Sequence, residues 1–297
     1  MIRIKYRPRP RLNAALYAAI FASTAVLAST AGLASASQIQ PQALDALPPA
    51  DVTILGELHD NPIHHLNQAR AVRALAPAAV VWEMLTEAQA ARMPERREDA
   101  AMVEATLGWA ESGWPDYALY HPITEAAGAA RHYGAHVPRA QAREAFAQGA
   151  APVFGAQAAR FGLQLPLDPA AQAMREAAQF EAHCRAMPEA MMAGLVEAQR
   201  LRDASLAQAV LMAMEQTGGP VVVITGNGHA RHDHGVPALL QIAAPEVSVL
   251  SLGQFESDAE SDAEAASGEA VPHDLWLVTA PHPRPDPCAA FAPPAEE

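Results

Sequence analysis

The chain has 297 residues and a formal net charge of −13, and hydrophobic residues make up 51% of it while aromatic residues make up only 5%. This length suits one large domain or a domain with an insertion, and apolar content that is largely alanine favours helices around a modest sheet. An acidic surface repels phosphate backbones, so the composition argues against nucleic acid as a partner.

The N-terminal segment, residues 1–36, has the three parts of a secretory signal. A basic stretch ends at Arg11, an apolar stretch runs from Leu12 to about Leu33, and Ala34-Ser35-Ala36 predicts cleavage near Ala36. Loss of its five basic residues takes the net charge from −13 to −18. We therefore expect an exported, periplasmic protein. The alternative is an uncleaved anchor, because the apolar stretch approaches the ~20 residues of a spanning helix. The segment contains no lipid-accepting cysteine.

After a linker at residues 37–50, the chain alternates between strand and helix patterns. Val52–Leu55 reads as a buried strand, and Asn61 with Pro62 begins a helix that runs to about Leu75. Residues 79–84 read as a second strand, and a helix with a break at Pro94 follows from Thr86 to about Leu107. This order predicts a parallel sheet covered on both faces, whose sites lie at the carboxyl ends of the strands.

The rest of the chain predicts an α/β fold: a mostly parallel central sheet flanked by helices, with a helical insertion subdomain. We expect a first core part at 51–140, a helical insertion at 141–205 and a second core part at 206–297. Further helix is expected at 123–133, further strands at 135–137, 221–224, 247–252 and 275–278, and a mobile acidic loop from Ser257 to Gly268.

Two similar turns each follow an apolar strand directly: Gly56-Glu57-Leu58-His59 and Gly226-Asn227-Gly228-His229. Glycine lets the chain turn sharply, and the histidine then projects from the strand end. Glu83 ends a third strand. We expect these side chains to share one rim of the sheet, where imidazoles and carboxylates suit metal binding or acid–base chemistry.

Two interpretations of this rim stay open. In the functional one, a metal ion is held by His59, His229 and Glu57, and the catalytic residues of a hydrolase are Glu57, His59, Glu83 and His229. In the other, the carboxylates cap neighbouring helices and the histidines bond only to loop carbonyls.

Aromatic residues gather between Trp109 and Tyr120 in a chain that has few of them. They could form a wall for a flat apolar ligand, with Tyr117 or Tyr120 as a ligand to haem iron, or simply pack a loop onto the sheet. His64 and His65, on the first turns of the helix after Asn61, are further candidate cofactor-binding residues. Cys184 and Cys288 are either a disulfide or two free thiols.

Several segments together resemble the ChaN family of haem-binding uptake proteins, which belongs to a superfamily with the Tiki, TraB and erythromycin-esterase-like proteins. They are ILGELHDNPIHH at 54–65, VWEM at 81–84, WPDY at 114–117, QRLRDA at 199–204 and GNGHARHDHGVP at 226–237. The resemblance implies an α/β core with a small helical domain and haem binding linked to iron uptake. By matching motifs it points to Glu57, His59, Glu83 and His229. Family members are typically lipoproteins, and this chain departs from them in lacking the lipid-accepting cysteine.

The function we expect is that of a periplasmic haem-binding protein linked to iron and haem uptake, with a site near the paired turns. The alternative is a metal-dependent hydrolase that uses His59, His229 and carboxylates to hold a divalent metal. A third interpretation gives the rim a structural or partner-binding role only. The expected ligand is haem or another small molecule, and a homodimer is left open as the assembly.

Overall fold

The computed structural model describes residues 36–257, 271–286 and 288–291. The predicted signal segment, apart from Ala36, and the predicted acidic loop, apart from Ser257, lie outside the described residues. Within the described part of the chain, no helix is both long and apolar enough to span a bilayer.

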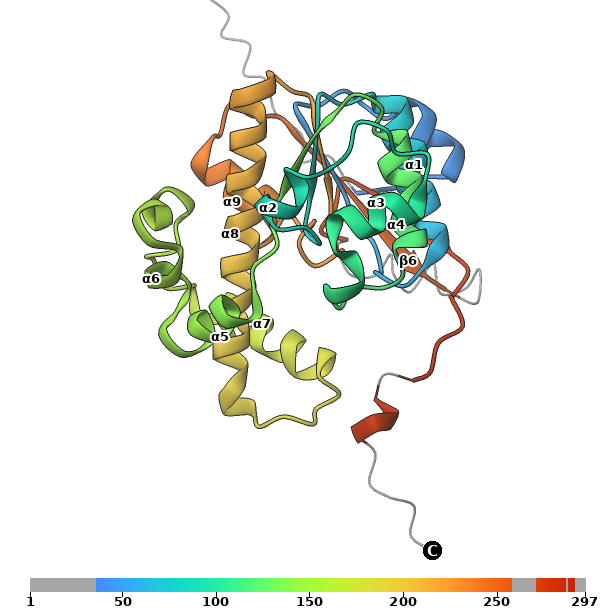
Figure 1. Cartoon of the computed structure of the whole chain (residues 1–297). Helices are drawn as coiled ribbons and strands as arrows, with labels where there is room; N and C mark the ends of the chain where they lie inside the picture. Colours follow the sequence, from blue (N-terminus) through green and yellow to red (C-terminus); the bar gives the residue numbers. More distant parts are fainter. Residues whose placement is uncertain (1–35, 258–270, 287, 292–297) are drawn as a thin grey trace, which may run out of the picture. The chain divides into compact units, whose positions relative to one another are not determined.

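The described chain folds around a sheet of seven strands in the order β1-β7-β6-β2-β5-β3-β4, and every neighbouring pair is parallel (Figure 1). This confirms the predicted α/β fold class. The strands are β1 (Ser37–Gln38), β2 (Val52–Leu55), β3 (Ala79–Trp82), β4 (Arg131–Gly134), β5 (Val221–Ile224), β6 (Val249–Glu256) and β7 (Leu275–Thr279).

β2, β5 and β3, which are adjacent in the sheet, are in register. Leu55 of β2 pairs with Ile224 of β5, which in turn pairs with Trp82 of β3. Because parallel neighbours run in the same direction, the residues that follow these three positions leave the sheet at the same level. This register places the turns after β2 and β5 beside the end of β3.

The main helices of the described chain are α1 (Pro62–Leu75), α2 (Glu87–Ala90), α3 (Ala100–Leu107), α4 (Tyr117–Ala126), α5 (Arg139–Gln148), α6 (Ala150–Phe154), α7 (Pro169–Ala182), α8 (Met192–Thr217) and α9 (Val236–Ala243). Short 3-10 turns are η1 (Pro41–Ala46), η2 (Trp109–Glu111), η3 (Gly155–Phe161), η4 (Glu189–Met191) and η5 (Ala289–Phe291). Asn61 caps α1 as predicted, because its side chain accepts hydrogen bonds from the backbone of Ile63 and His64.

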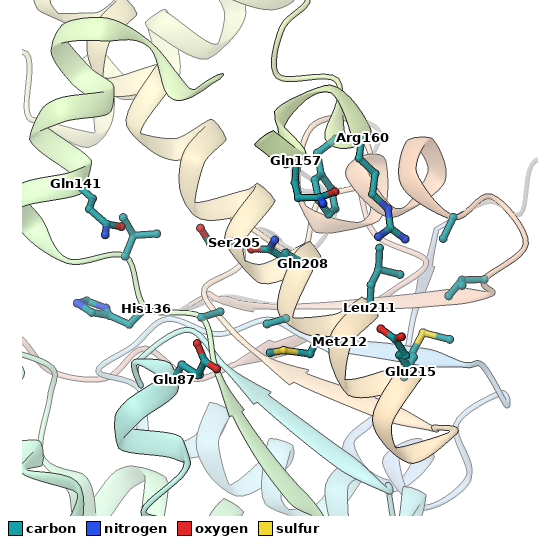
Figure 2. Close-up of a pocket in the computed structure, with 18 of the residues that line it drawn as sticks. Glu87, His136, Gln141, Gln157, Arg160, Ser205, Gln208, Leu211, Met212 and Glu215 are labelled. Atoms are coloured by element: carbon teal, nitrogen blue, oxygen red, sulfur yellow. The ribbon is translucent and has the colours of Figure 1, made fainter. Parts of the chain in front are cut away.

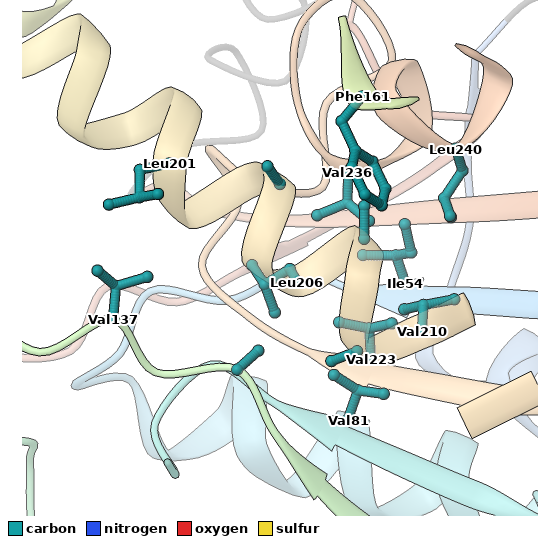
Figure 3. Packing of buried hydrophobic residues seen from close by; sticks show 14 of the residues in the cluster. Ile54, Val81, Val137, Phe161, Leu201, Leu206, Val210, Val223, Val236 and Leu240 are labelled. Carbon is teal, nitrogen blue, oxygen red and sulfur yellow. The ribbon is translucent and has the colours of Figure 1, made fainter. Parts of the chain in front are cut away.

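Alternating strand residues bury two separate apolar layers. Ile54, Val81 and Val223 face α8 and α9, where Val210 and Leu240 pack against them (Figure 3). Leu55, Trp82 and Ile224 face the opposite way, onto α1, α3 and α4. Both faces of the sheet are therefore covered, as expected for β2, β3 and β5, in which every residue is buried.

Two predicted elements lie elsewhere, and a third has its break where it was expected. The strand expected at 135–137 lies instead at Arg131–Gly134. The first two residues of this edge strand, β4, are not buried, so its pattern is less apolar than that of the inner strands. The helix expected from Thr86 to Leu107 is interrupted over 91–99, which includes the expected break at Pro94, and forms α2 and α3. The helix expected at 123–133 begins earlier, at Tyr117, where Asp116 caps it.

A disulfide joins Cys184, just after α7, to Cys288 near the C-terminus. This decides between the two alternatives that the sequence left open. The bridge ties the segment after β7 to the helices between β4 and β5.

Candidate functional site

Carboxylates and imidazoles converge where β2, β3 and β5 end. Glu57 and His59 follow β2, Glu83 follows β3 and His229 follows β5. Nε2 of His59 lies 4.0 Å and Nε2 of His229 lies 3.5 Å from Oε1 of Glu83. The two turns therefore bring their imidazoles to the same carboxylate oxygen.

The first half of this cluster is built on Glu57, which is 1% exposed. Its Oε1 lies 2.7 Å from Nδ1 of His59 and accepts a hydrogen bond of 3.1 Å from the hydroxyl of Tyr120 on α4. Nδ1 of His65, on α1, lies 3.3 Å from Oε2 of Glu57. Glu57 thus links the first turn to the helices on one face of the sheet.

The second half runs from Glu83 to the helices on the other face. Oε2 of Glu83 accepts hydrogen bonds from the hydroxyl of Thr225 at 2.7 Å and from the backbone N–H of Gly226 at 2.8 Å. Nδ1 of the buried His229 lies 2.6 Å from Oδ1 of Asp203 on α8. Oδ2 of Asp203 in turn lies 3.6 Å from the guanidinium of Arg175 on α7.

These contacts shift the pKa values of the cluster. Burial alone would lower the pKa of His229, but the charges of Glu83 and Asp203 raise it above its ordinary value of 6.5. Burial opposes ionisation of Glu83, yet His229 and His59 hold its pKa below 4.5. Burial likewise lowers the pKa of His59, and the hydrogen bond with Glu57 and the charge of Glu83 outweigh it, so the net shift is upward. His229 therefore carries a positive charge between two carboxylates near neutral pH.

Glycine is required in both turns by close approach. A Cβ atom on Gly56 would lie 2.9 Å from the backbone oxygen of Leu252 and would also collide with the side chain of Asn227. A Cβ atom on Gly226 would lie 2.9 Å from Nε2 of His59. Real Cβ contacts are not this short, so each turn is packed directly against its neighbours.

The four candidate cofactor-binding residues are all buried, at 0–1% exposure. The hydroxyl of Tyr117 bonds to Thr124, and that of Tyr120 bonds to Glu57. Nδ1 of His64 accepts a hydrogen bond from the backbone N–H of Leu58, and Nε2 of His65 lies 3.0 Å from the carbonyl oxygen of His59. Tyr120, His64 and His65 thus support the first turn from within, whereas the hydroxyl of Tyr117 bonds within α4, and the assignment of all four to cofactor binding stays a prediction.

The candidate metal ligands His59, His229 and Glu57 do not form a metal-binding group. Nδ1 of His59 faces Glu57 and Nδ1 of His229 faces Asp203, so the carboxylates pair with the imidazoles. Among the described residues, no group of three or more His, Cys, Asp or Glu side chains is arranged to hold a metal ion. The arrangement is that of charged hydrogen-bonded pairs rather than a coordination shell.

One pocket opens beside this cluster, at Glu83, and a larger pocket adjoins it. The smaller, of about 200 Å³, is lined by Glu83, Trp114, His136, Arg139 and Arg202 among others. The larger, of about 840 Å³, extends along α8 towards η3 and includes Leu211, Met212, Arg160 and Phe161 (Figure 2). Ala135, His136 and Val137 line both, so the two pockets are adjacent at the segment that follows β4.

The sequence did not single out Asp203, Arg175 or His136. Asp203 belongs to the QRLRDA segment that supported the family resemblance, and a carboxylate on an alanine-rich helix was the available signal. Nothing in the sequence places α8 beside β5, because the contact between Asp203 and His229 depends on how the insertion returns to the sheet.

Comparison with known proteins identifies the family. The sequence pattern of the family described as "Haem-binding uptake, Tiki superfamily, ChaN" matches residues 43–240, about two thirds of the chain. The chain belongs to this family. No curated protein sequence matches this ChaN-family chain.

One solved structure shares this fold. "Cofacial heme binding to ChaN of Campylobacter jejuni" aligns over 72% of this ChaN-family chain and 83% of that chain, with 18% identical residues and a TM-score of 0.55. The type III effector HopBA1 aligns over 78% of this chain and 88% of that chain, with 12% identity and a TM-score of 0.37. The first similarity shows a shared fold, and the second is too weak to support an argument.

Proposed function

We propose that this protein binds haem in an exported uptake system, at a site beside the paired Gly-x-x-His turns. The observation that carries the proposal is the family match over residues 43–240, which describes haem-binding uptake proteins. The Campylobacter jejuni protein of the same fold is described by its cofacial haem binding. Membership of the family supports haem as the ligand, and the position of the site is inferred from the pockets of this chain.

The residues around the larger pocket suit a porphyrin. A volume of about 840 Å³ lies within the range of small-molecule and cofactor sites. Leu211, Met212 and Phe161 offer apolar and polarisable surface to a flat ring, His136 offers an imidazole, and Arg160 offers a cation to carboxylates. When bound, haem would supply an iron atom that a protein side chain can ligate. The chain would supply the walls of the pocket, with Arg160 as the counter-charge.

The charged cluster borders the smaller pocket, which adjoins the larger one at residues 135–137. Glu83 lines the smaller pocket, and its carboxylate is fixed by Thr225 and Gly226 on one side and by His229 on the other. A rim held by this many charged hydrogen bonds is rigid, and a rigid wall lowers the entropy lost when a ligand binds. We therefore assign the paired turns to shaping the site.

Haem binding is tested by titrating the purified mature protein with haemin and following the Soret band. A saturable change with a fixed stoichiometry is expected. The control is the same titration in urea, which removes the folded pocket. A Soret change that rises without saturation, or that is the same in urea, would show that the folded chain has no haem site.

We also propose that residues 1–36 are removed during export to the periplasm, since they carry the pattern of a secretory signal. N-terminal sequencing of protein expressed in full in a bacterium is expected to begin at Ser37, and cell fractionation is expected to find it in the periplasm. Ala36→Asp places a charged residue where a small one is needed and is expected to block cleavage. A wild-type chain that keeps residues 1–36 would contradict cleavage.

A further inference from the structure

The smaller pocket, at Glu83, carries an excess of positive charge. Its charged lining residues are Glu83, Arg139 and Arg202, so two guanidinium groups face one carboxylate. The remaining titratable group is His136, whose pKa burial lowers from 6.5, so that its imidazole is neutral near pH 7. One positive charge is left over. In a chain with a net charge of −13, a concave site of this sign attracts an anion.

The carboxylate of Glu83 is already engaged on the side of the paired turns. Its Oε1 lies 3.5 Å from Nε2 of the charged His229, and its Oε2 accepts a hydrogen bond of 2.7 Å from the hydroxyl of Thr225. These partners hold the pKa of Glu83 below 4.5 and offset its charge locally. The repulsion that Glu83 would exert on an anion in the pocket is therefore reduced.

The two arginines of the pocket are free to bind a ligand. Arg139 begins α5 and Arg202 lies on α8, and both charges act on His136, whose pKa they help to lower. Arg202 donates a hydrogen bond of 2.8 Å to Oε1 of Gln199, and neither arginine forms an ion pair with a carboxylate within the described part of the chain. A guanidinium binds a carboxylate with two parallel N–H donors.

The rest of the pocket wall is largely apolar. Trp114, Val137 and Leu206 line it. The indole ring of Trp114 lies between two imidazoles, with its centroid 4.8 Å from that of His59 and 5.9 Å from that of His136. Nε1 of Trp114 is buried and has no hydrogen-bond partner among the described residues. Buried donors are normally paired, so this N–H is available to an acceptor on a ligand.

We infer that the smaller pocket binds a small organic monocarboxylate. Its carboxylate would lie between Arg139 and Arg202, and its apolar body would pack against Trp114. A single negative charge matches the excess of one positive charge, whereas a phosphate dianion would exceed it and would leave the apolar wall unused. The volume of about 200 Å³ is below the ~300–1,000 Å³ of sites for larger ligands, so a porphyrin is not the occupant. This inference goes beyond the proposed haem binding and does not depend on it.

The test is calorimetric titration of the purified mature protein with benzoate, which has one carboxylate on a flat apolar ring. We expect saturable binding that weakens as salt is added, because ions screen the arginines. Arg139→Gln and Arg202→Gln are each expected to weaken binding on the order of 10-fold, since each removes a hydrogen bond between charged groups. The matched control is Arg143→Gln, which removes an exposed arginine of α5 that does not line this pocket and should leave the affinity unchanged.

Nuclear magnetic resonance locates the bound probe. In protein labelled with nitrogen-15, the four tryptophan indole N–H groups give separate signals, and Trp114→Phe identifies that of Trp114 by its loss. Benzoate is expected to shift this signal more than the other three. A larger shift at another tryptophan would place the probe outside the pocket and would contradict the inference.

Other outcomes would also overturn the inference. They are the absence of saturable benzoate binding by the wild type, an unchanged affinity in the variant that combines Arg139→Gln with Arg202→Gln, and equal binding of benzylamine, which carries a positive charge on the same ring. Competition by inorganic phosphate at equal affinity would show that the pocket takes a plain oxyanion. If the glutamine variants do not fold, Arg202→Lys keeps the charge but loses the two parallel donors, and it is expected to weaken benzoate binding. Because haemin is absent from these experiments, their failure leaves the proposed haem binding untouched.

Discussion

Asp203→Asn tests whether the buried charges at the sheet edge stabilise the fold. Asp203 is 2% exposed and holds His229 at 2.6 Å and Arg175 at 3.6 Å. A hydrogen bond to a charged group contributes ~1.5–3 kcal/mol, and breaking a buried ion pair by removing one partner costs ~3–5 kcal/mol. Asparagine keeps the shape and one acceptor, so we expect the free energy of unfolding to fall by about 2–3 kcal/mol at about pH 6.

The dependence on pH follows from the direction of each shift. The pKa of His229 is raised in the folded state, so its contribution is complete below 6.5 and is lost as the pH rises above that value. The pKa of Glu83 is lowered, so its contribution is complete above 4.5 and is lost as the pH falls below it. The cluster therefore stabilises the fold most between pH 4.5 and 6.5. The difference between wild type and variant is expected to shrink as the pH rises above 6.5, the ordinary pKa of His229.

Urea unfolding followed by circular dichroism, repeated across this pH range, measures both effects. Asp45→Asn is the matched control, because it removes the same charge from an exposed ion pair with Arg70, and it is expected to change the unfolding free energy far less. A loss below about 0.5 kcal/mol for Asp203→Asn, or a loss that does not vary with pH, would refute the picture of a charged imidazole between two carboxylates.

Two further predictions concern packing and the disulfide. Gly56→Ala is expected to destabilise the fold by ~1–3 kcal/mol in urea unfolding, because its Cβ would lie 2.9 Å from the backbone oxygen of Leu252. Gly228→Ala, whose Cβ meets no atom within 4 Å, is the control, and equal losses in the two variants would contradict this account. Cys184 and Cys288 are expected to react in a thiol assay of the denatured protein only after reduction. Cys288→Ser is expected to increase proteolysis after β7, and cleavage at the wild-type rate would show that the bridge does not hold this segment.

The sequence predicted the parts of the fold that depend on local patterns. The β-branched runs at Val52–Leu55 and Val221–Ile224 and the cap at Asn61 carry their own signals, so these two strands, the helix start and the α/β class are confirmed. The sequence placed edge strand β4 too late, at 135–137. Its first residues, Arg131 and His132, are not buried and lack the apolar run of an inner strand.

The candidate site was predictable only in part, because some of its residues are brought there by tertiary packing and not by a local sequence pattern. Glu57 and Glu83 follow β2 and β3, parallel strands on either side of β5, so the rule that parallel strands end together was enough to bring them to one edge. Asp203 and His136 reach the same region through the return of α8 and the end of β4, which depend on tertiary packing. The burial of Tyr120 and His65 behind the first turn likewise depends on how α1 and α4 pack against each other.

One of the two counter-charges of His229 is Asp203 on α8, and Asp203 in turn contacts Arg175 on α7; both helices precede β5 in the chain. Replacing this helical segment with that of a relative would keep the sheet and Glu83 but remove one of the two carboxylates beside a buried imidazolium. The helical segment therefore cannot be exchanged by itself. A functional chimera would have to take Asp203 and His229 from the same protein.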